Sequence, residues 1–265
     1  MKRFFITLLL SALIAFQASA GTDEENSLSK KNSGNVSGNV KECFEGLNRS
    51  VFAFNQGLDK IIFKPVSKAY LKLPNSVRRG TGNAVTNLSN VLTIPNNLLQ
   101  GNFLRAGENT ARLLINTTVG VLGIFDVASS LGFSKYAKED YGQTLGSWGI
   151  GEGCYVVLPV LGPSTARDAF VSFGSLNTGL DPWYNITAGK DTHHFNDFDY
   201  YSSRGVNALD FRAKNIDSFN NLEKNSMDFY ASVKSLYLQD RRRKINNSNK
   251  ITETLDDSGW EELGN

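Results

Sequence analysis

The chain has 265 residues, of which 40% are apolar and 20% charged, a composition typical of a folded protein rather than a disordered one. It carries 28 basic and 26 acidic side chains, and two of the basic ones, Lys2 and Arg3, lie in the first 20 residues. Without that segment the charges balance. This excludes the basic excess that nucleic-acid binding requires, so we expect no nucleic-acid partner.

Residues 1–20 predict a cleaved export signal, because a charged start is followed by the mostly apolar run 4–16 and then by small residues before Gly21. A helix of that run rises only about 20 Å, against roughly 30 Å of membrane hydrocarbon, so a retained transmembrane anchor is the poorer interpretation. We expect the polar segment 21–41 to be a flexible tether. No other apolar run approaches spanning length, so any membrane contact must come from amphipathic helices lying in one leaflet.

Folded structure is expected to begin at residue 42 with an amphipathic helix. Apolar residues recur there at spacings of three and four, which places six of them on one helical face: Phe44, Leu47, Val51, Phe54, Leu58 and Ile61. Phe52, Ile62 and Phe63 widen this stripe, as suits a helix that touches both protein and lipid.

Further helices are predicted over residues 66–71, 76–90, 102–116, 164–173, 196–222 and 226–244. Pro95 is expected to bend or restart the chain, and the glycine-punctuated apolar segment 117–128 is predicted to be a buried helix. We expect residues 174–197 to be irregular and residues 245–265 to be a disordered tail.

The segment 140–168 is the part least like a generic core. Gly149, Gly151 and Gly153 alternate with other residues, which predicts a tight hairpin between the runs 144–150 and 154–158. The following Gly162, Pro163 and Ser164 predict a turn into a helix that Ser164 caps.

This segment, DYGQTLGSWGIGEGCYVVLPVLGPSTARD, resembles the MlaA (VacJ) family of Gram-negative outer-membrane proteins, which remove misplaced phospholipid from the cell surface. Family members carry similar FGQTLG and LGPST-RD runs. A second block is similar to the family's EGFNR, FxFN and KPV signature in the same order, with FEGLNR at 44–49, VFAFN at 51–55 and KPV at 64–66. Weaker echoes extend the resemblance over residues 42–244, which it marks as a single MlaA-like domain.

The resemblance implies a mainly α fold, a ring-like bundle of amphipathic helices with one short glycine-rich β-hairpin. It implies a passive phospholipid channel in the inner leaflet of the outer membrane, beside trimeric porins, that takes mislocalised phospholipids from the outer leaflet and passes them to a soluble periplasmic carrier of the MlaC type. Typical members carry an acylated cysteine at the first mature position. This chain has Gly21 there, so we expect it to lack the lipid anchor.

Two parts of the chain are candidates for the lipid channel or its gate. The hairpin from Trp148 to Tyr155, with Gly149, Gly151 and Gly153, is the first, because a glycine-rich turn changes shape at little steric cost. A rigid packing element is the alternative. Phe54 and Asn55 of the first signature block are the second candidate for controlling the opening.

Arg241, Arg242 and Arg243 end the last predicted helix, where cations complement its dipole and are candidates for contact with phospholipid headgroups. A solvated helix end is the alternative. Cys43 and Cys154 are the two cysteines of the chain, and they either form one disulfide or remain two independent buried thiols.

The sequence argues against an enzyme. The histidines are the adjacent pair His193 and His194, and Ser164 lacks the G-x-S-x-G context of a hydrolase nucleophile. No metal-ligand spacing accompanies the histidines, and the pair Gly189–Lys190 lacks the phosphate-binding glycine loop, so neither a metal nor a nucleotide cofactor is expected. The rival interpretations are a soluble periplasmic structural or interaction protein and an exported hydrolase.

Overall fold

The computed structural model describes residues 42–134, 137–188 and 197–248. All of them belong to one compact unit that begins at Val40. The predicted export signal, the predicted tether and the pair His193–His194 lie outside the described residues, as does the predicted tail beyond residue 248.

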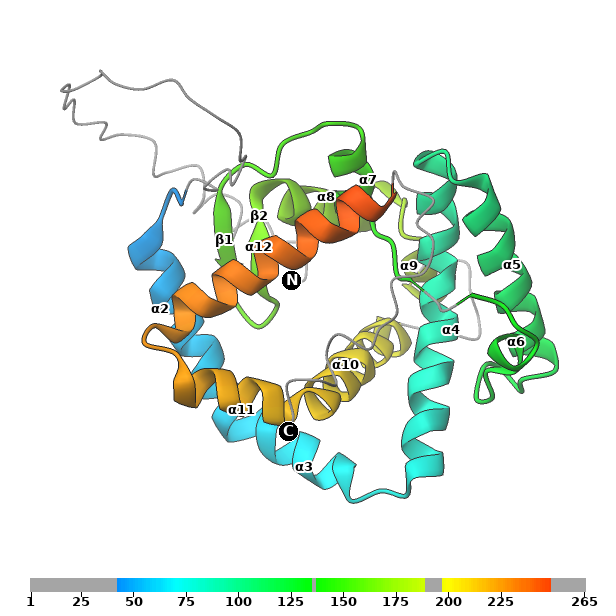
Figure 1. Ribbon diagram of the computed structural model, residues 1–265, viewed down its shortest axis with the longest axis horizontal. Coiled ribbons are helices and arrows are strands. Elements are labelled where there is room, and N and C mark those ends of the chain that lie inside the picture. Colours follow the sequence, from blue (N-terminus) through cyan, green and yellow to red (C-terminus); the bar gives the residue numbers. More distant parts are fainter. Residues whose placement is uncertain (1–41, 135–136, 189–196, 249–265) are drawn as a thin grey trace. The chain divides into compact units, whose positions relative to one another are not determined.

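The described chain is mainly helical and contains one antiparallel hairpin, which confirms the predicted fold class (Figure 1). The helices are α2 (Glu45–Leu58), the π-helical segment η1 (Asp59–Phe63), α3 (Lys64–Leu71), α4 (Asn75–Leu99), α5 (Phe103–Thr118), α6 (Val127–Ser130), α7 (Tyr141–Ser147), α8 (Ala166–Thr178), α9 (Pro182–Ala188), α10 (Asp197–Lys214), α11 (Ile216–Asn225) and α12 (Phe229–Ser248). The hairpin pairs β1 (Tyr155–Leu158) with β2 (Gly162–Thr165), with Leu158 opposite Gly162.

The elements contact one another in a closed circuit. Starting from α2, the contacts run through η1, α3, α10, α4, α7, α12, β2 and β1 and return to α2. This order of contacts agrees with the ring-like bundle that the sequence led us to expect. Helix α5 packs along α4 outside the circuit, and the two helices lie side by side (Figure 1).

The hairpin lies further along the chain than predicted. Residues 144–147 belong to α7, because the Asp140 side chain accepts a hydrogen bond from the backbone N–H of Gln143 at 2.9 Å and so caps a helix there. Gly149, at φ 88°, ends that helix instead of turning a hairpin. The strands join through residues 159–161, and Thr165, not Ser164, caps α8 by accepting from the N–H of Asp168.

Other boundaries were also predicted wrongly. Pro95 lies inside α4, which continues to Leu99 because packing against α5 supports it. Residues 119–126 form turns rather than a buried helix, with Val121 and Leu122 at positive φ and exposed. The segment expected to be irregular contains the end of α8 and all of α9, while the long helix expected over 196–222 breaks at Asn215. Helix α12 extends four residues into the predicted tail.

The apolar core is small and lies around the hairpin. Tyr155 and Val157 of β1 pack with Tyr230 and Leu238 of α12, and Phe52 of α2 covers them. Tyr155 meets Tyr230 edge-on at 6.1 Å between ring centroids. Just before β1, Cys154 forms a disulfide with Cys43, across 111 residues of sequence. The core and the disulfide together hold β1 between α2 and α12.

Candidate functional site

Helices α4 and α5 expose apolar side chains and bury polar ones, the reverse of the distribution in a water-soluble protein. Large apolar residues of α5 point outward, with Leu104 77% and Leu114 60% exposed. Leu98 and Leu99 at the end of α4 are also about half exposed. A soluble protein exposes single apolar residues without consequence, but a whole face of them indicates contact with an apolar surrounding or a partner.

The faces that α4 and α5 bury are polar. Helix α4 buries five polar residues: Asn87, Asn90, Thr93, Asn96 and Asn97. Helix α5 buries Asn109, Arg112 and Asn116 at spacings of three and four. Polar side chains at a helix–helix contact, with apolar side chains facing out, are typical of proteins whose surrounding is lipid.

Arg112 of α5 is the centre of a group of polar contacts with the segment 126–134. Only 3% exposed, it donates to both carboxylate oxygens of Asp126 at 3.0 Å and to the carbonyl oxygen of Ser134 at 2.8 Å. Asn116 donates to Asp126 as well, at 2.9 Å, and accepts from the N–H of Ala128. These contacts tie the turn 119–126 and α6 to α5, and they satisfy the charges that the fold removes from water.

No helix in the described part of the chain combines the length and the apolar character needed to cross a bilayer.

The first signature block docks the hairpin. Asn48 of α2 donates to the Tyr155 carbonyl at 3.1 Å and accepts from the Val157 N–H at 2.9 Å. Seven residues later, Asn55 repeats the pattern with the Leu158 carbonyl at 2.9 Å and the Val160 N–H at 2.7 Å. Two turns of helix thus place two amides on one face, where each fills a backbone hydrogen-bonding position at the edge of β1.

The predicted gate residues do not form a single group. Tyr155 is buried, whereas Trp148 is exposed and donates from its indole N–H to the Leu99 carbonyl at 3.0 Å. Gly149 and Gly153 have positive φ, while Gly151 lies in open space between them. Phe54 is 55% exposed beside the docked Asn55.

The three arginines of α12 are differently placed. Arg241 is buried and pairs with two carboxylates, so its charge is matched inside the protein, and its role as a headgroup contact stays a prediction. Arg242 donates to Glu152 at 2.9 Å, which joins α12 to the segment before β1. Arg243 is exposed and pairs with Asp240 within its own helix at 3.0 Å. Pairs with residues about a hundred positions away cannot be read from the local pattern.

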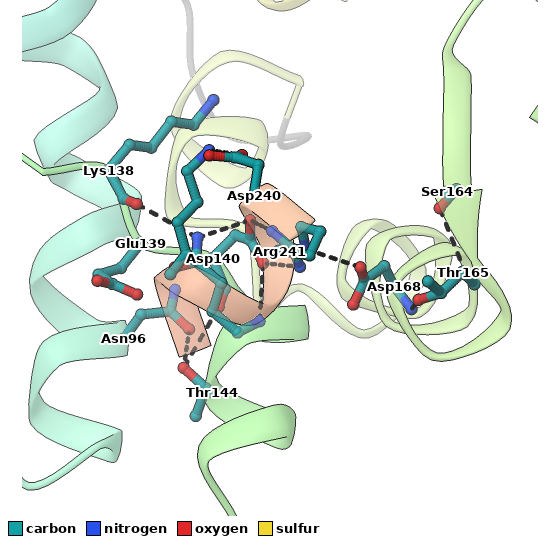
Figure 2. Close-up of polar contacts among 12 residues, drawn as sticks. Asn96, Lys138, Glu139, Asp140, Thr144, Ser164, Thr165, Asp168, Asp240 and Arg241 are labelled. Carbon is teal, nitrogen blue, oxygen red and sulfur yellow. Dashed lines mark hydrogen bonds and ion pairs between the residues drawn. The ribbon is translucent and has the colours of Figure 1, made fainter. Parts of the chain in front are cut away.

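The segment that opens with Asp140 is organised around Arg241 (Figure 2). Its guanidinium donates to both oxygens of Asp140, at 2.7 and 3.0 Å, and its Nε lies 2.9 Å from Asp168 Oδ2. Burial raises the pKa of Asp140, but the hydrogen bonds and charge of Arg241 outweigh it and hold that pKa well below its usual range. The cluster therefore joins the start of α7, the first turn of α8 and the end of α12.

The two glycines of α7 make this cluster possible. A Cβ at Gly142 would lie 2.3 Å from Asp168 Oδ1 and 2.6 Å from an Arg241 nitrogen. A Cβ at Gly146, one turn later, would lie 2.6 Å from the Ile245 side chain. The GQTLG run therefore lets α7 approach α8 and α12 closely, and we infer that its role is packing.

The intervening residues of α7 connect to α4. Thr144 donates to the Asn96 amide oxygen at 2.7 Å (Figure 2). It accepts from Gln100, which also donates to Glu139 at 3.0 Å. Burial raises the pKa of Glu139; the Gln100 hydrogen bond lowers it, and the nearby charge of Asp140 raises it further, so the net direction is upward.

The buried polar stripe of α4 was missed in the sequence, although a signal was present. Asn87, Asn90, Thr93 and Asn97 recur at spacings of three, three and four, the same period by which apolar faces are recognised. A search for polar periodicity, as well as apolar periodicity, identifies the face. Asn48 likewise belongs to the first signature block, but its role was not predicted.

The fold and this surface define a mainly helical protein with a polar interior and apolar outward faces. A family model described as MlaA lipoprotein matches residues 40–244. A solved structure from work on the structural basis for maintenance of bacterial outer membrane lipid asymmetry is similar, with a TM-score of 0.68 and 30% identity, over 78% of this chain and 100% of the other.

Relatives agree. A protein of Rickettsia bellii is 32% identical over 80% of this chain and 82% of its own length. The intermembrane phospholipid transport system lipoprotein MlaA of Haemophilus influenzae is 28% identical over 97% of each chain. The chain belongs to the MlaA family, as its motifs led us to expect.

We predict that Gly142→Ala destabilises the protein by about 3 kcal/mol, because the new methyl group must displace one side of a buried ion pair. Equilibrium unfolding in urea measures this loss. Gly107→Ala is the matched control: it lies in α5, no atom lies within 4 Å of a methyl group placed there, and alanine favours a helix, so the free energy of unfolding should rise by roughly 0.5–1 kcal/mol. Equal effects of the two substitutions would contradict the packing role of Gly142.

We predict that Glu139→Gln raises Tm at pH 7 more than at pH 4. A carboxyl whose folded-state pKa is raised contributes stability below its unfolded pKa of about 4.3, and this stability is lost as the pH rises through the folded pKa. The amide has no charge to bury at either pH. Asp140→Asn should act in the opposite direction and lower Tm at pH 7, since the pKa of Asp140 is depressed. Calorimetry across this pH range tests both, and a shift of Tm in Glu139→Gln that is the same at the two pH values would contradict the assignment.

Proposed function

We propose that this chain acts in phospholipid transport that maintains outer-membrane lipid asymmetry, as a passive conduit seated in the inner leaflet of the outer membrane. The observation that carries the proposal is the distribution of side chains on α4 and α5, which expose large apolar residues and bury polar ones. Membership of the MlaA family supports it.

The physical problem is the headgroup. A phospholipid misplaced in the outer leaflet must bring a polar headgroup through an apolar slab, and a polar passage lowers that free-energy cost. The tails need only remain in contact with hydrocarbon. Helices with one polar and one apolar face separate these two requirements.

Some buried amide groups of α4 have atoms without a protein hydrogen-bond partner. Within the described residues, Asn87 Oδ1, Asn90 Oδ1 and Asn97 Nδ2 are buried and have no protein hydrogen-bond partner. Buried amides of this kind are ordinarily satisfied by internal water. A hydrated stripe along α4 supports the idea of a wetted interior.

The proposal includes partners. The relative from Haemophilus influenzae is named as part of an intermembrane phospholipid transport system, and by analogy we propose that this chain passes lipid to a soluble periplasmic carrier of the MlaC type and lies beside a trimeric porin. We propose no catalytic step: movement is downhill or driven by the partners.

Membrane attachment is the first test. We propose that the apolar faces of the helices hold the protein at the membrane. Leu104→Glu combined with Leu114→Glu places two charges on the outward face of α5, and each costs up to about 3 kcal/mol in hydrocarbon. We expect carbonate washing to release this variant at least tenfold more than the wild type, which should require detergent.

The control carries the same two added charges elsewhere. Ser235→Glu and Gln239→Glu alter exposed positions of α12 and should leave retention unchanged. A wild-type chain that salt or carbonate removes completely would favour the rival, a soluble periplasmic structural or interaction protein.

The gate is the second test. No atom lies within 4 Å of a Cβ placed on Gly151, and its φ is not in the left-handed region, so Gly151→Val should fold normally. If the segment 148–155 changes shape during transport, the β-branched side chain should reduce phospholipid clearance severalfold while the protein remains in the envelope. Surface phospholipid is measured by outer-leaflet lipid labelling. Gly46→Val, at an equally open position in α2, is the control, and unimpaired clearance by Gly151→Val would assign the segment a rigid packing role.

A further inference from the structure

A pocket of about 550 Å³ opens between the first turns of α4 and the turn that leads into α6. Helix α4 contributes Arg79, Gly80 and Asn83, and the turn contributes Ile124, Phe125 and Asp126. Gly80 lets Ile124 pack closely against α4, since a Cβ on Gly80 would lie 3.0 Å from the Ile124 side chain.

Arg79 gives the pocket a free positive charge. Its side chain is exposed, and among the described residues it has neither an ion-pair nor a hydrogen-bond partner. The adjacent Arg78, in contrast, is used within the fold: it donates to the Leu73 carbonyl at 3.1 Å and to the Asn75 side chain. A guanidinium has five N–H donors in a planar fork that fits a phosphate, so Arg79 is chemically available for one.

The carboxylate in the same pocket does not cancel this charge. Asp126 accepts from Arg112 and Asn116, and from the Ser129 hydroxyl at 2.6 Å and the Ser129 N–H at 3.2 Å. Its charge is matched by the buried Arg112. The charge left over in the pocket is therefore positive.

The rim of the pocket is apolar. Val77, Ile124 and Phe125 are each more than two-fifths exposed, and the exposed Val121 and Leu122 continue the apolar surface along the turn. A free phosphate gains nothing from such a rim. A molecule that carries both a phosphate and hydrocarbon chains uses both parts.

The geometry points to a phospholipid headgroup site in this pocket, in which Arg79 binds the phosphate and the acyl chains lie over Val77, Ile124 and Phe125. The inference rests on the proposed function and adds to it a defined place where a lipid is held. Asn83 is engaged with the Ile124 carbonyl at 3.1 Å and fixes the wall of the pocket rather than the ligand.

The test measures binding of dihexanoylphosphatidylethanolamine, a short-chain phospholipid, to the full purified chain in detergent. Because a charge-assisted hydrogen bond contributes about 1.5–3 kcal/mol, Arg79→Gln should weaken binding at least tenfold. Arg79→Lys keeps the charge but loses the planar fork, so its affinity for the lipid should lie between those of the wild type and Arg79→Gln. Arg105→Gln is the matched control: it removes a cation beside the exposed Phe103 and Leu104 of α5, outside the residues that line the pocket, and should bind like the wild type.

Two further probes separate the sources of a signal. Inorganic phosphate should bind at least tenfold more weakly than the lipid, and dihexanoylglycerol, which has no phosphate, should bind without dependence on Arg79. Phosphate binding as tight as the lipid's would overturn the lipid assignment, and dihexanoylglycerol binding as tight as the phospholipid's would reduce the pocket to an apolar groove. A phosphatidylethanolamine with a photoreactive headgroup should cross-link within residues 76–83 or 124–130, and cross-links confined to other segments would overturn the site.

The two proposals fail differently. If Arg79→Gln binds the lipid as the wild type does while the wild-type chain still requires detergent for extraction, the pocket assignment is wrong and the proposed function stands. If carbonate strips the wild-type chain from membranes, the proposed function fails whatever Arg79 does. Gly80→Val offers an independent check, because its side chain keeps Arg79 but presses on Ile124 of the apolar rim and should also weaken lipid binding.

Discussion

A polar group that leaves water must be paired, and this requirement organises the structure more than apolar burial does. One cluster of buried apolar side chains lies around β1 and α12. Many contacts between the other elements are polar: Asn87 with Thr117 between α4 and α5, Arg112 with Asp126, and Arg241 with Asp140 and Asp168. Because breaking one partner of such a pair leaves the other buried and alone, each pair fixes the relative position of its elements. The apolar side chains that a soluble protein would use as core are thereby left for the exterior.

Much of the fold could be predicted from the sequence, because periodicity and motif order are local properties. Helix α2 (Glu45–Leu58) lies where apolar spacings of three and four predicted a helix, and α5 (Phe103–Thr118) lies within two residues of the predicted range 102–116. The predicted boundaries are wrong where the same residue type is compatible with two different local structures. Gly149 has positive φ, which suits a hairpin or the end of a helix, and the choice depended on Asp140 capping α7 nine residues earlier. Pro95 breaks an isolated helix, but α5 supports α4 along its length.

The candidate sites were harder to predict, because their partners are distant in sequence. Asn55 was chosen as a gate residue and lies beside the hairpin, but its amide hydrogen-bonds to the edge of β1 together with that of Asn48. Arg241, Arg242 and Arg243 look alike in the chain, yet one is buried between two carboxylates, one joins Glu152, and one is exposed. Only the fold decides which cation of a cluster is available for a ligand.

The same reasoning separates motif from function. The residues that mark the family most clearly, Gly142 to Gly146 and Asn48 to Asn55, hold α7 against α12 and β1 against α2. These residues serve contacts inside the protein, so they indicate the fold rather than a lipid-binding site. A residue that binds lipid must have a charged or hydrogen-bonding group that no other protein group occupies, at a surface that lipid can reach. In α4 this condition divides the adjacent pair Arg78 and Arg79, since the first is bound within the helix start and the second faces a pocket with an apolar rim. The scaffold motif and the lipid-binding residue are therefore expected in different parts of the chain, and unpaired charge beside exposed hydrocarbon is the feature by which the latter is recognised.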